Sequence, residues 1–269
     1  MARGAAVTAA VTAVASGRRP APALARLPWA LGAATVLLEI GYPLVDGRAR
    51  DLLTVTTVAV FFLASTTHAL VWRGARWSAL LVAVTAGGGF LVEWVGTRTG
   101  RPFGHYSYGG TLGPQLAGVP LVIPLAWTMM AYPALLAARR LTSSAAAGPV
   151  VAGWALAAWD LFLDPQMVAA GHWRWSRPGL TLPGIPDVPL SNFAGWLLVA
   201  VAMMAALRRW LPDRRPADDR LPQALFLWTW ASSILASAAF FGRPAVAVWG
   251  GVGMGLVAVP LAVAMRRGR

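Results

Sequence analysis

The chain has 269 residues, of which 57% are hydrophobic and only 12% are charged, and its formal net charge is +13. Soluble domains carry about 25% charged residues, and here the missing charge coincides with apolar runs near the ~20 residues that span a bilayer. These values exclude a soluble enzyme, a disordered chain and, because there is no Cys, a disulfide-stabilised secreted domain. They predict a polytopic membrane protein.

In chain order, the hydropathy pattern predicts an all-α membrane bundle of about eight spans. Residues 1–27 are expected to form a cytoplasmic tail, with a cleaved signal segment as the alternative. Residues 266–269 would form a basic C-terminal tail, so that residues 28–265 make one transmembrane domain. The predicted spans are 28–45, 52–72, 77–96, 117–138, 147–164, 189–207, 222–241 and 244–265.

The basic residues predict how the bundle is oriented. All 23 are Arg, and they lie in small clusters between the spans. Such clusters flank membrane helices and do not line a basic groove, so we expect no nucleic-acid partner. With both termini inside, 16 Arg face the cytoplasm and 7 face the other side. The positive-inside rule therefore predicts a multi-pass protein of the plasma membrane with both termini in the cytoplasm.

Two long outer loops, residues 97–116 and 165–188, predict an internal repeat. Both contain Gly-His-aromatic-x-aromatic at an offset of 67 residues, and a carboxylate stands eleven residues before each Gly. The matching residues are Glu93, Gly104 to Tyr108, Gly118 to Pro120 and Trp127 in the first unit, and Asp160, Gly171 to Trp175, Gly184 to Pro186 and Trp196 in the second. Short matches also arise by chance, because interface loops are generally rich in Trp and Tyr. The spacing favours a parallel repeat of two helices per unit, made of spans three to four and five to six.

Four carboxylates lie within or at the ends of apolar spans, namely Glu39, Glu93, Asp160 and Asp164. A charged side chain at mid-membrane costs at least about 2.5–3.5 kcal/mol, so such residues are candidates for function. Asp160 and Asp164 are four residues apart and share one helix face, and Pro165 is expected to end that helix. Because two carboxylates so close should not both ionise, this pair can offer one acid and one base.

Structural roles are the alternative for these carboxylates. Asp160 or Asp164 could form a structural ion pair with Arg174 or Arg177. Glu39 could bind a neighbouring helix. His together with Asp and Glu is also a possible set of metal ligands. The sequence has no His-x-x-x-His or comparable cluster, so we expect no metal.

The residues expected to bind substrate are His105, Tyr106, Tyr108, His172, Trp173, Trp175 and Asn192. The two histidines could relay protons or orient the acids. The Tyr and Trp residues could line an apolar slot whose π faces stabilise a cation, although both residue types also populate membrane interfaces. Asn192, with Ser191, could cap the sixth span or hold a water.

Acids at the mouth of an apolar bundle, surrounded by aromatic residues, suit proton-initiated chemistry on a lipid-soluble alkene. An acid protonates the double bond, aromatic faces stabilise the tertiary carbocation, and water attacks it. The sequence contains no Lys and no phosphate-binding Gly-rich loop, so nothing in it indicates nucleotide use.

Two groups of motifs carry a family resemblance over residues 85–205. The first is Glu93-Trp94-Val95-Gly96 with Thr99-Gly100-x-Pro102-Phe103-Gly104-x-Tyr106-x-Tyr108 and Gly118-Val119-Pro120. The second is Asp160-Leu161-x-x-Asp164-Pro165-x-Met167 with Gly171-x-Trp173-x-Trp175, Gly184-Ile185-Pro186 and Asn192-Phe193-x-Gly195-Trp196. In these motifs the chain resembles the membrane carotenoid hydratases of bacteria and archaea, which include the carotenoid 1,2-hydratases and the bisanhydrobacterioruberin hydratases.

The resemblance implies an enzyme that adds water across the terminal 1,2 double bond of an acyclic carotenoid end group without a cofactor. By matching position it implies that Glu93, Asp160 and Asp164 are catalytic. The partners would be the carotenoid, water, membrane lipid and other enzymes of the carotenoid pathway. A small insertion at residues 187–190 departs from the family pattern and leaves the loop geometry and the choice of substrate open.

Two other functions remain open on the sequence alone. A different carotenoid or isoprenoid enzyme, a cyclase or prenyltransferase, would use Asp160 and Asp164 to bind Mg²⁺ and a diphosphate, although only one such Asp pair is present. A proton-coupled transporter would also have repeats and intramembrane acids.

Overall fold

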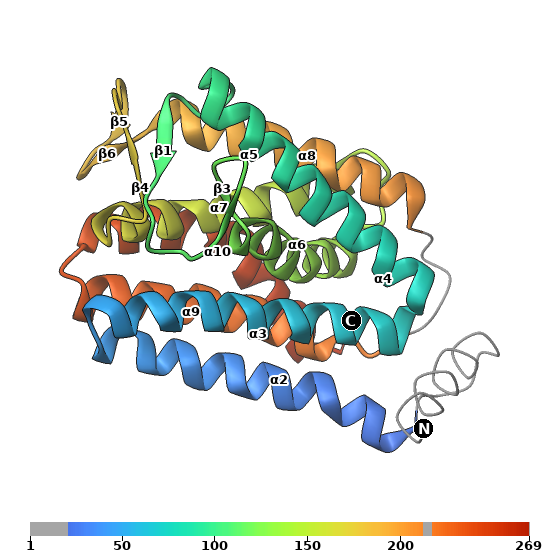
Figure 1. Ribbon diagram of the computed structural model, residues 1–269. Helices are drawn as coiled ribbons and strands as arrows, with labels where there is room; N and C mark the ends of the chain where they lie inside the picture. Colours follow the sequence, from blue (N-terminus) through green and yellow to red (C-terminus); the bar gives the residue numbers. More distant parts are fainter. Residues whose placement is uncertain (1–20, 212–216, 269) are drawn as a thin grey trace.

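The computed structural model describes residues 21–211 and 217–268, which form a bundle of long helices (Figure 1). In these residues, seven helical segments are long and apolar enough to cross a membrane, and α7 is a further helix of 23 residues packed among them. The predicted all-α polytopic bundle is confirmed. The helices are α2 (Pro22–Gly41), α3 (Gly47–Arg73), α4 (Ala75–Val82), α5 (Gly88–Thr99), α6 (Val122–Leu141), α7 (Ala147–Ala169), α8 (Leu190–Trp210), α9 (Arg220–Leu235) and α10 (Pro244–Arg266), with short helical turns η1 (Tyr42–Leu44), η2 (Ala83–Gly87) and η3 (Ala236–Phe240).

Several helix boundaries differ from the predicted ones, and three of them have a clear physical reason. α2 begins at Pro22 and not at residue 28, because Pro fits the first turn of a helix, where no N–H donor is needed. Residues 1–20 of the expected tail lie outside the described residues. α6 begins at Val122 and not at residue 117, because the residues before it form a hairpin. The expectation that Pro165 ends the fifth span is wrong, since α7 continues to Ala169. Neighbouring helices in a membrane bundle offset the one helical hydrogen bond that Pro removes.

The centre of the bundle is formed by α6 and α7. α6 packs against α3, α7 and α9, and α7 also packs against α8 and α10. Two glycines of α10 allow its close approach to α7: a Cβ on Gly250 would lie 2.6 Å from Phe162, and a Cβ on Gly253 would lie 2.6 Å from Leu161. Small residues commonly permit such contacts between membrane helices. The side chains that α7 directs inward are therefore shielded on several sides.

Short strands from the two long loops meet at one end of the bundle, at the left in Figure 1. β1 (Tyr106–Tyr108) pairs antiparallel with β4 (Trp173–Trp175). β2 (Gln115–Leu116) pairs with β3 (Val119–Pro120), and β5 (Thr181–Leu182) pairs with β6 (Ile185–Pro189). The two loops therefore lie on the same side of the bundle, as predicted.

The predicted repeat is present in the structure. The first unit runs α5, β1, the β2–β3 hairpin and α6, and the second runs α7, β4, the β5–β6 hairpin and α8. The glycine that opens each Gly-aliphatic-Pro motif has a positive φ, 87° at Gly118 and 79° at Gly184, which L side chains rarely adopt. The equivalent residues Trp127 and Trp196 stack on each other, with ring centroids 4.0 Å apart and planes 5° from parallel. The two units thus pack directly against one another.

Candidate active site

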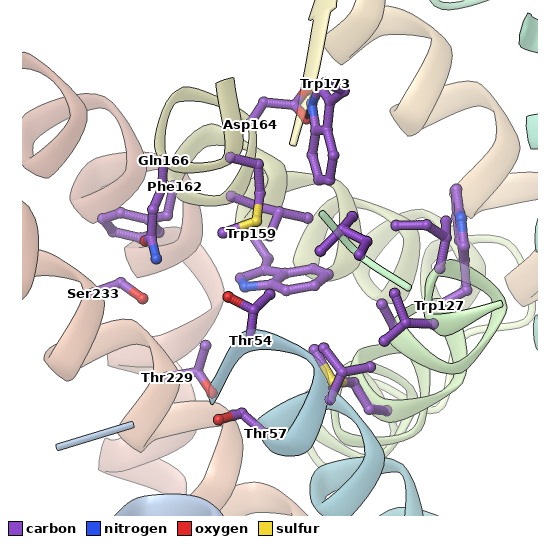
Figure 2. A pocket seen from close by; sticks show the side chains of 18 of the residues that line it. Thr54, Thr57, Trp127, Trp159, Phe162, Asp164, Gln166, Trp173, Thr229 and Ser233 are labelled. Atoms are coloured by element: carbon purple, nitrogen blue, oxygen red, sulfur yellow. Dashed lines mark hydrogen bonds between the residues drawn. The ribbon is translucent and has the colours of Figure 1, made fainter. Parts of the chain in front are cut away.

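A cavity of about 170 Å³ lies inside the bundle, where residues of both repeat units meet residues of α2, α3 and α9. Glu93 and Asp164 line the part of it that we call the acid end, and Glu39 and Thr57 line the part that we call the hydroxyl end. In Figure 2, Asp164 lies at one side of the cavity and Thr57 at the other, with the indole of Trp159 between them. Predicted acids from both units therefore face one cavity.

Glu93 of α5 receives three hydrogen bonds. Tyr106 Oη and Tyr108 Oη donate to Oε2 at 2.5 and 2.7 Å, and Trp127 Nε1 donates to Oε1 at 3.1 Å. Burial raises the pKa of both tyrosines well above the usual range, and the neighbouring Glu93 raises it further. Both phenols therefore keep an O–H to donate. A carboxylate can only accept and has about four lone-pair sites, so the three donors leave one site open. The three hydrogen bonds hold the side chain in a fixed direction.

Two glycines make room for these donors. Gly89 and Gly96 lie four residues before and three residues after Glu93 and so share its face of the helix. A Cβ on Gly89 would lie 2.7 Å from the Trp127 ring, and a Cβ on Gly96 would lie 2.8 Å from Tyr106 Oη. Sequence reasoning missed this role, although the Gly-x-x-x-Glu-x-x-Gly spacing carries the signal.

Asp160 and Asp164 lie on α7 and are each only 2% exposed. Asn192 of α8 bridges them, because its Nδ2 donates to Asp160 Oδ2 at 2.9 Å and also to Asp164 Oδ2. Trp173 Nε1 donates to Asp164 Oδ1 at 3.0 Å. Because one amide group contacts both carboxyl groups, Asp160 and Asp164 lie close together, and a proton on either of them would allow that group to donate a hydrogen bond to the other. The pair can therefore hold one shared proton.

Two structural alternatives for these residues are wrong. Asn192 does not cap the sixth span: α8 follows Pro189, and no side chain caps it. Arg174 and Arg177 are exposed, and within residues 21–211 and 217–268 they make no ion pair with Asp160 or Asp164. N–H donors, and not guanidinium groups, therefore compensate for the burial of the carboxyl pair.

Aromatic rings of the two paired strands lie between the acids. The ring centroid of Tyr108 lies 5.6 Å from that of Tyr106 and 5.7 Å from that of Trp173, and Tyr106 lies 5.8 Å from Trp175. Alternate residues of a strand point to one face, which places all four rings on the cavity wall. Such rings can stabilise a cation between Glu93 and the Asp pair.

The two histidines lie away from the cavity wall. His105 is exposed, and its ring packs on Gly100. His172 is buried, with Nδ1 2.7 Å from Thr111 Oγ1 and Nε2 3.8 Å from Asp51 Oδ1. Burial lowers the pKa of His172, and Asp51 acts in the opposite direction. His172 thus connects the second long loop to the first loop and to α3.

The hydroxyl end also contains a carboxyl group. Trp228 Nε1 of α9 donates to Glu39 Oε2 of α2 at 2.6 Å, so the expected contact of Glu39 with a neighbouring helix is present. Among the described residues, the buried atoms Tyr42 Oη and Thr57 Oγ1 have no hydrogen-bond partner, and both side chains line the cavity. Unpartnered buried hydroxyl groups can bind water, so this end can hold water.

The chain matches one protein family over most of its length. The profile of the family described as carotenoid biosynthesis protein matches residues 51–260. The chain belongs to this family. A curated relative, the bisanhydrobacterioruberin hydratase of Haloarcula japonica, is 37% identical over 151 residues, which are 51% of this chain and 50% of the relative. The matched segment thus covers about half of the length of each protein. No solved structure matches the chain.

The family match covers the whole acid end. Glu93, Asp160 and Asp164 fall within the matched residues, as does Asn192, whereas Glu39 precedes them. The matched range therefore includes the residues of the acid end and leaves out Glu39 of the hydroxyl end.

Proposed function

We propose that this carotenoid biosynthesis protein is a hydratase. In this proposal it adds water, without a cofactor, to the terminal 1,2 double bond of an acyclic carotenoid end group. One observation carries the proposal: carboxyl groups from two repeat units face a single aromatic-lined cavity inside a membrane bundle. The family and the name of the Haloarcula relative support the reaction class.

Asp164 acts as the acid. It lines the cavity, and it can share a proton with Asp160. Transfer of that proton to the CH carbon of the double bond forms a C–H bond and leaves a tertiary carbocation on the other carbon. The N–H groups of Asn192 and Trp173 then stabilise the Asp164 carboxylate that remains.

Glu93 acts as the base. The faces of Tyr106, Tyr108 and the Trp residues of β4 stabilise the carbocation. Water attacks that carbon, a C–O bond forms, and the proton released from the water passes to Glu93. Because three donors already fix the direction of Glu93, the base needs little rearrangement during the step.

We place the acid end toward the outer face of the plasma membrane, with both termini in the cytoplasm. The distribution of Arg supports this orientation through the positive-inside rule. In this arrangement β1 and β4 cover the acid end at the outer surface, and the carotenoid enters from the membrane.

Expression in a host that makes an acyclic carotenoid tests the proposal. Mass spectrometry of the extracted pigments should show a gain of one water with the wild-type protein and no gain with Asp164→Asn or Glu93→Gln. Asp187→Asn, which changes an exposed carboxylate, is the matched control and should give wild-type product. Unchanged pigment from the wild type, or full hydration by both site variants, would contradict the proposal.

A chelator separates this reaction from a Mg²⁺-dependent one. Asn192 and Trp173 donate N–H groups to three of the four carboxyl oxygens of Asp160 and Asp164, and these groups would repel a cation. Hydration by the purified protein should therefore persist in the chelator. Loss of activity that added Mg²⁺ restores would favour the diphosphate chemistry instead.

A further inference from the structure

Asp160 faces a second space that is separate from the cavity. A crevice of about 20 Å³ is lined by Asp160 and by apolar residues of α7, α8 and the β5–β6 hairpin. A space of this size holds about one water. Asp160 lines the crevice but not the cavity, whereas Asp164 lines the cavity but not the crevice. The carboxyl pair therefore connects two spaces.

The contacts of Asp160 suit proton transfer better than a purely structural role. The Nδ2 atom of Asn192 donates to one oxygen of each Asp and so holds the two carboxyl groups together. The other oxygen, Asp160 Oδ1, is buried and receives no donor from the described part of the chain. Buried polar atoms in folded proteins are nearly always hydrogen-bonded, and a water in the crevice would supply the missing partner.

The proposed hydration leaves the enzyme with its proton on the wrong carboxyl group. In each turnover Asp164 gives a proton to carbon, and Glu93 receives one from the attacking water. The overall reaction consumes no proton, but Asp164 must be protonated again, and Glu93 must be deprotonated, before the next turnover. Asp164 lines the cavity, so product that fills the cavity would displace the water from which Asp164 could take a proton. A route that avoids the cavity would restore the acid.

We infer that Asp160 restores the proton of Asp164 from water in the crevice, which makes the crevice a proton inlet for the active site. This inference rests on the proposed function. The O–H bond of Asp160 breaks as the O–H bond of Asp164 forms across their contact, and the Asp160 carboxylate then takes a proton from solvent through the crevice water. Glu93 releases its proton to solvent when product leaves the cavity, so protons balance over the cycle.

Single-turnover and steady-state hydration by Asp160→Asn test this inference. The full chain in bilayer nanodiscs would be given an acyclic carotenoid. With protein in excess each molecule acts once, and the rate should stay within about threefold of wild type. With substrate in excess the rate should fall by about 100-fold or more, as when a general acid is lost. Asp164→Asn should lose both rates, and Asp187→Asn, an exposed carboxylate of β6, should keep both.

Val188→Phe provides a second test that leaves every carboxyl group in place. Val188 lines the crevice, so a larger side chain there should lower the steady-state rate and spare the first turnover, even if Asp160→Asn does not fold. Equal loss of both rates in folded Asp160→Asn would mean that Asp160 is already needed for the first proton transfer, and wild-type rates in both assays would remove Asp160 from the cycle. Either result overturns the inference. Failure of the proposed function is a different outcome, because wild type would then form no hydrated product in either assay.

Discussion

Adding one methyl group at Gly96 tests whether the phenol of Tyr106 must reach Glu93. A Cβ at this position would lie 2.8 Å from Tyr106 Oη and 2.9 Å from Phe103 Cδ2. The Tyr106 ring has little space to retreat, because the rings of Phe103 and Tyr108 lie 6.1 and 5.6 Å away, centroid to centroid. We expect Gly96→Ala to move the phenol off the carboxyl group.

The effect of Gly96→Ala on stability can be estimated separately from its effect on the hydration rate. Ala is favoured over Gly within a helix by about 0.5–1 kcal/mol, whereas overpacking costs about 1–3 kcal/mol. The net loss of stability is therefore about 0–2.5 kcal/mol. A hydrogen bond to a charged group contributes about 1.5–3 kcal/mol. A rate falls tenfold for about every 1.36 kcal/mol added to the barrier. Losing this hydrogen bond in the transition state should therefore slow hydration by about 10- to 150-fold.

The assay compares the hydration rates of Gly96→Ala and Gly88→Ala in the same preparation. A Cβ on Gly88 would approach nothing closer than Met203 Cε at 3.7 Å, an ordinary contact, so this control should keep the wild-type rate. Tyr106→Phe removes the O–H without overpacking and should reproduce the rate loss even if Gly96→Ala folds poorly. Equal rates for the two alanine variants, with Tyr106→Phe as active as wild type, would refute the role given to this contact.

Three further predictions concern the acids and the contacts that hold the bundle. Glu93→Gln and Asp164→Asn should each slow hydration of an acyclic carotenoid at least about 100-fold while circular dichroism shows an intact fold; a wild-type rate would remove that residue from the mechanism. Arg73→Met should lower the free energy of unfolding by about 1.5–3 kcal/mol, because Arg73 Nη2 lies 2.6 and 2.7 Å from the two carboxylate oxygens of Asp219, whose side chain is 23% exposed and can still be hydrated; an unchanged thermal midpoint would count against this. Since burial lowers the pKa of His172 from its ordinary value of 6.5, the unfolded chain binds the proton more readily, and stability should fall as the pH drops below about 6.5. His172→Gln should weaken that pH dependence in thermal unfolding, and identical curves would show that His172 is not its source.

The acids of the candidate site could be predicted because burying a carboxylate in an apolar span is energetically unfavourable. The aromatic rings could be predicted because they recur in the matching motifs of the two long loops. Placing a carboxylate within an apolar span costs free energy unless another group compensates for its burial. This cost identified Glu93, Asp160 and Asp164 as candidate functional residues. Tyr106 and Tyr108 were predicted to line an apolar slot, and in β1 the period of two places both rings on the cavity side.

The partners of the acids could not be predicted, because they depend on how distant segments approach one another. The spacing predicted that His105 relays protons or orients an acid, yet the turn before β1 leaves His105 exposed and directs Tyr106 inward to Glu93. Asn192 stands where a helix cap is usual, but the packing of α8 on α7 brings its amide to the Asp pair. The role of Gly96 becomes visible only once Tyr106 is in place.

The helix that carries the Asp pair shows where a rule from soluble proteins misled the prediction. The residue before a Pro is disfavoured in a helix, which placed the end of the fifth span at residue 164. In the bundle α7 continues for another turn beyond Pro165. Contacts with neighbouring helices outweigh one missing hydrogen bond, a balance that no local pattern reveals.

Hydration in heavy water tests most directly whether buried carboxyl groups give protons to a hydrocarbon. The purified wild-type protein would be incubated with an acyclic carotenoid in D₂O, where the Asp and Glu protons exchange before the reaction. We predict a hydrated product that carries one non-exchangeable deuterium on the carbon next to the new C–OH. A hydrated product without carbon-bound deuterium, or no hydrated product at all, would contradict the proposed chemistry.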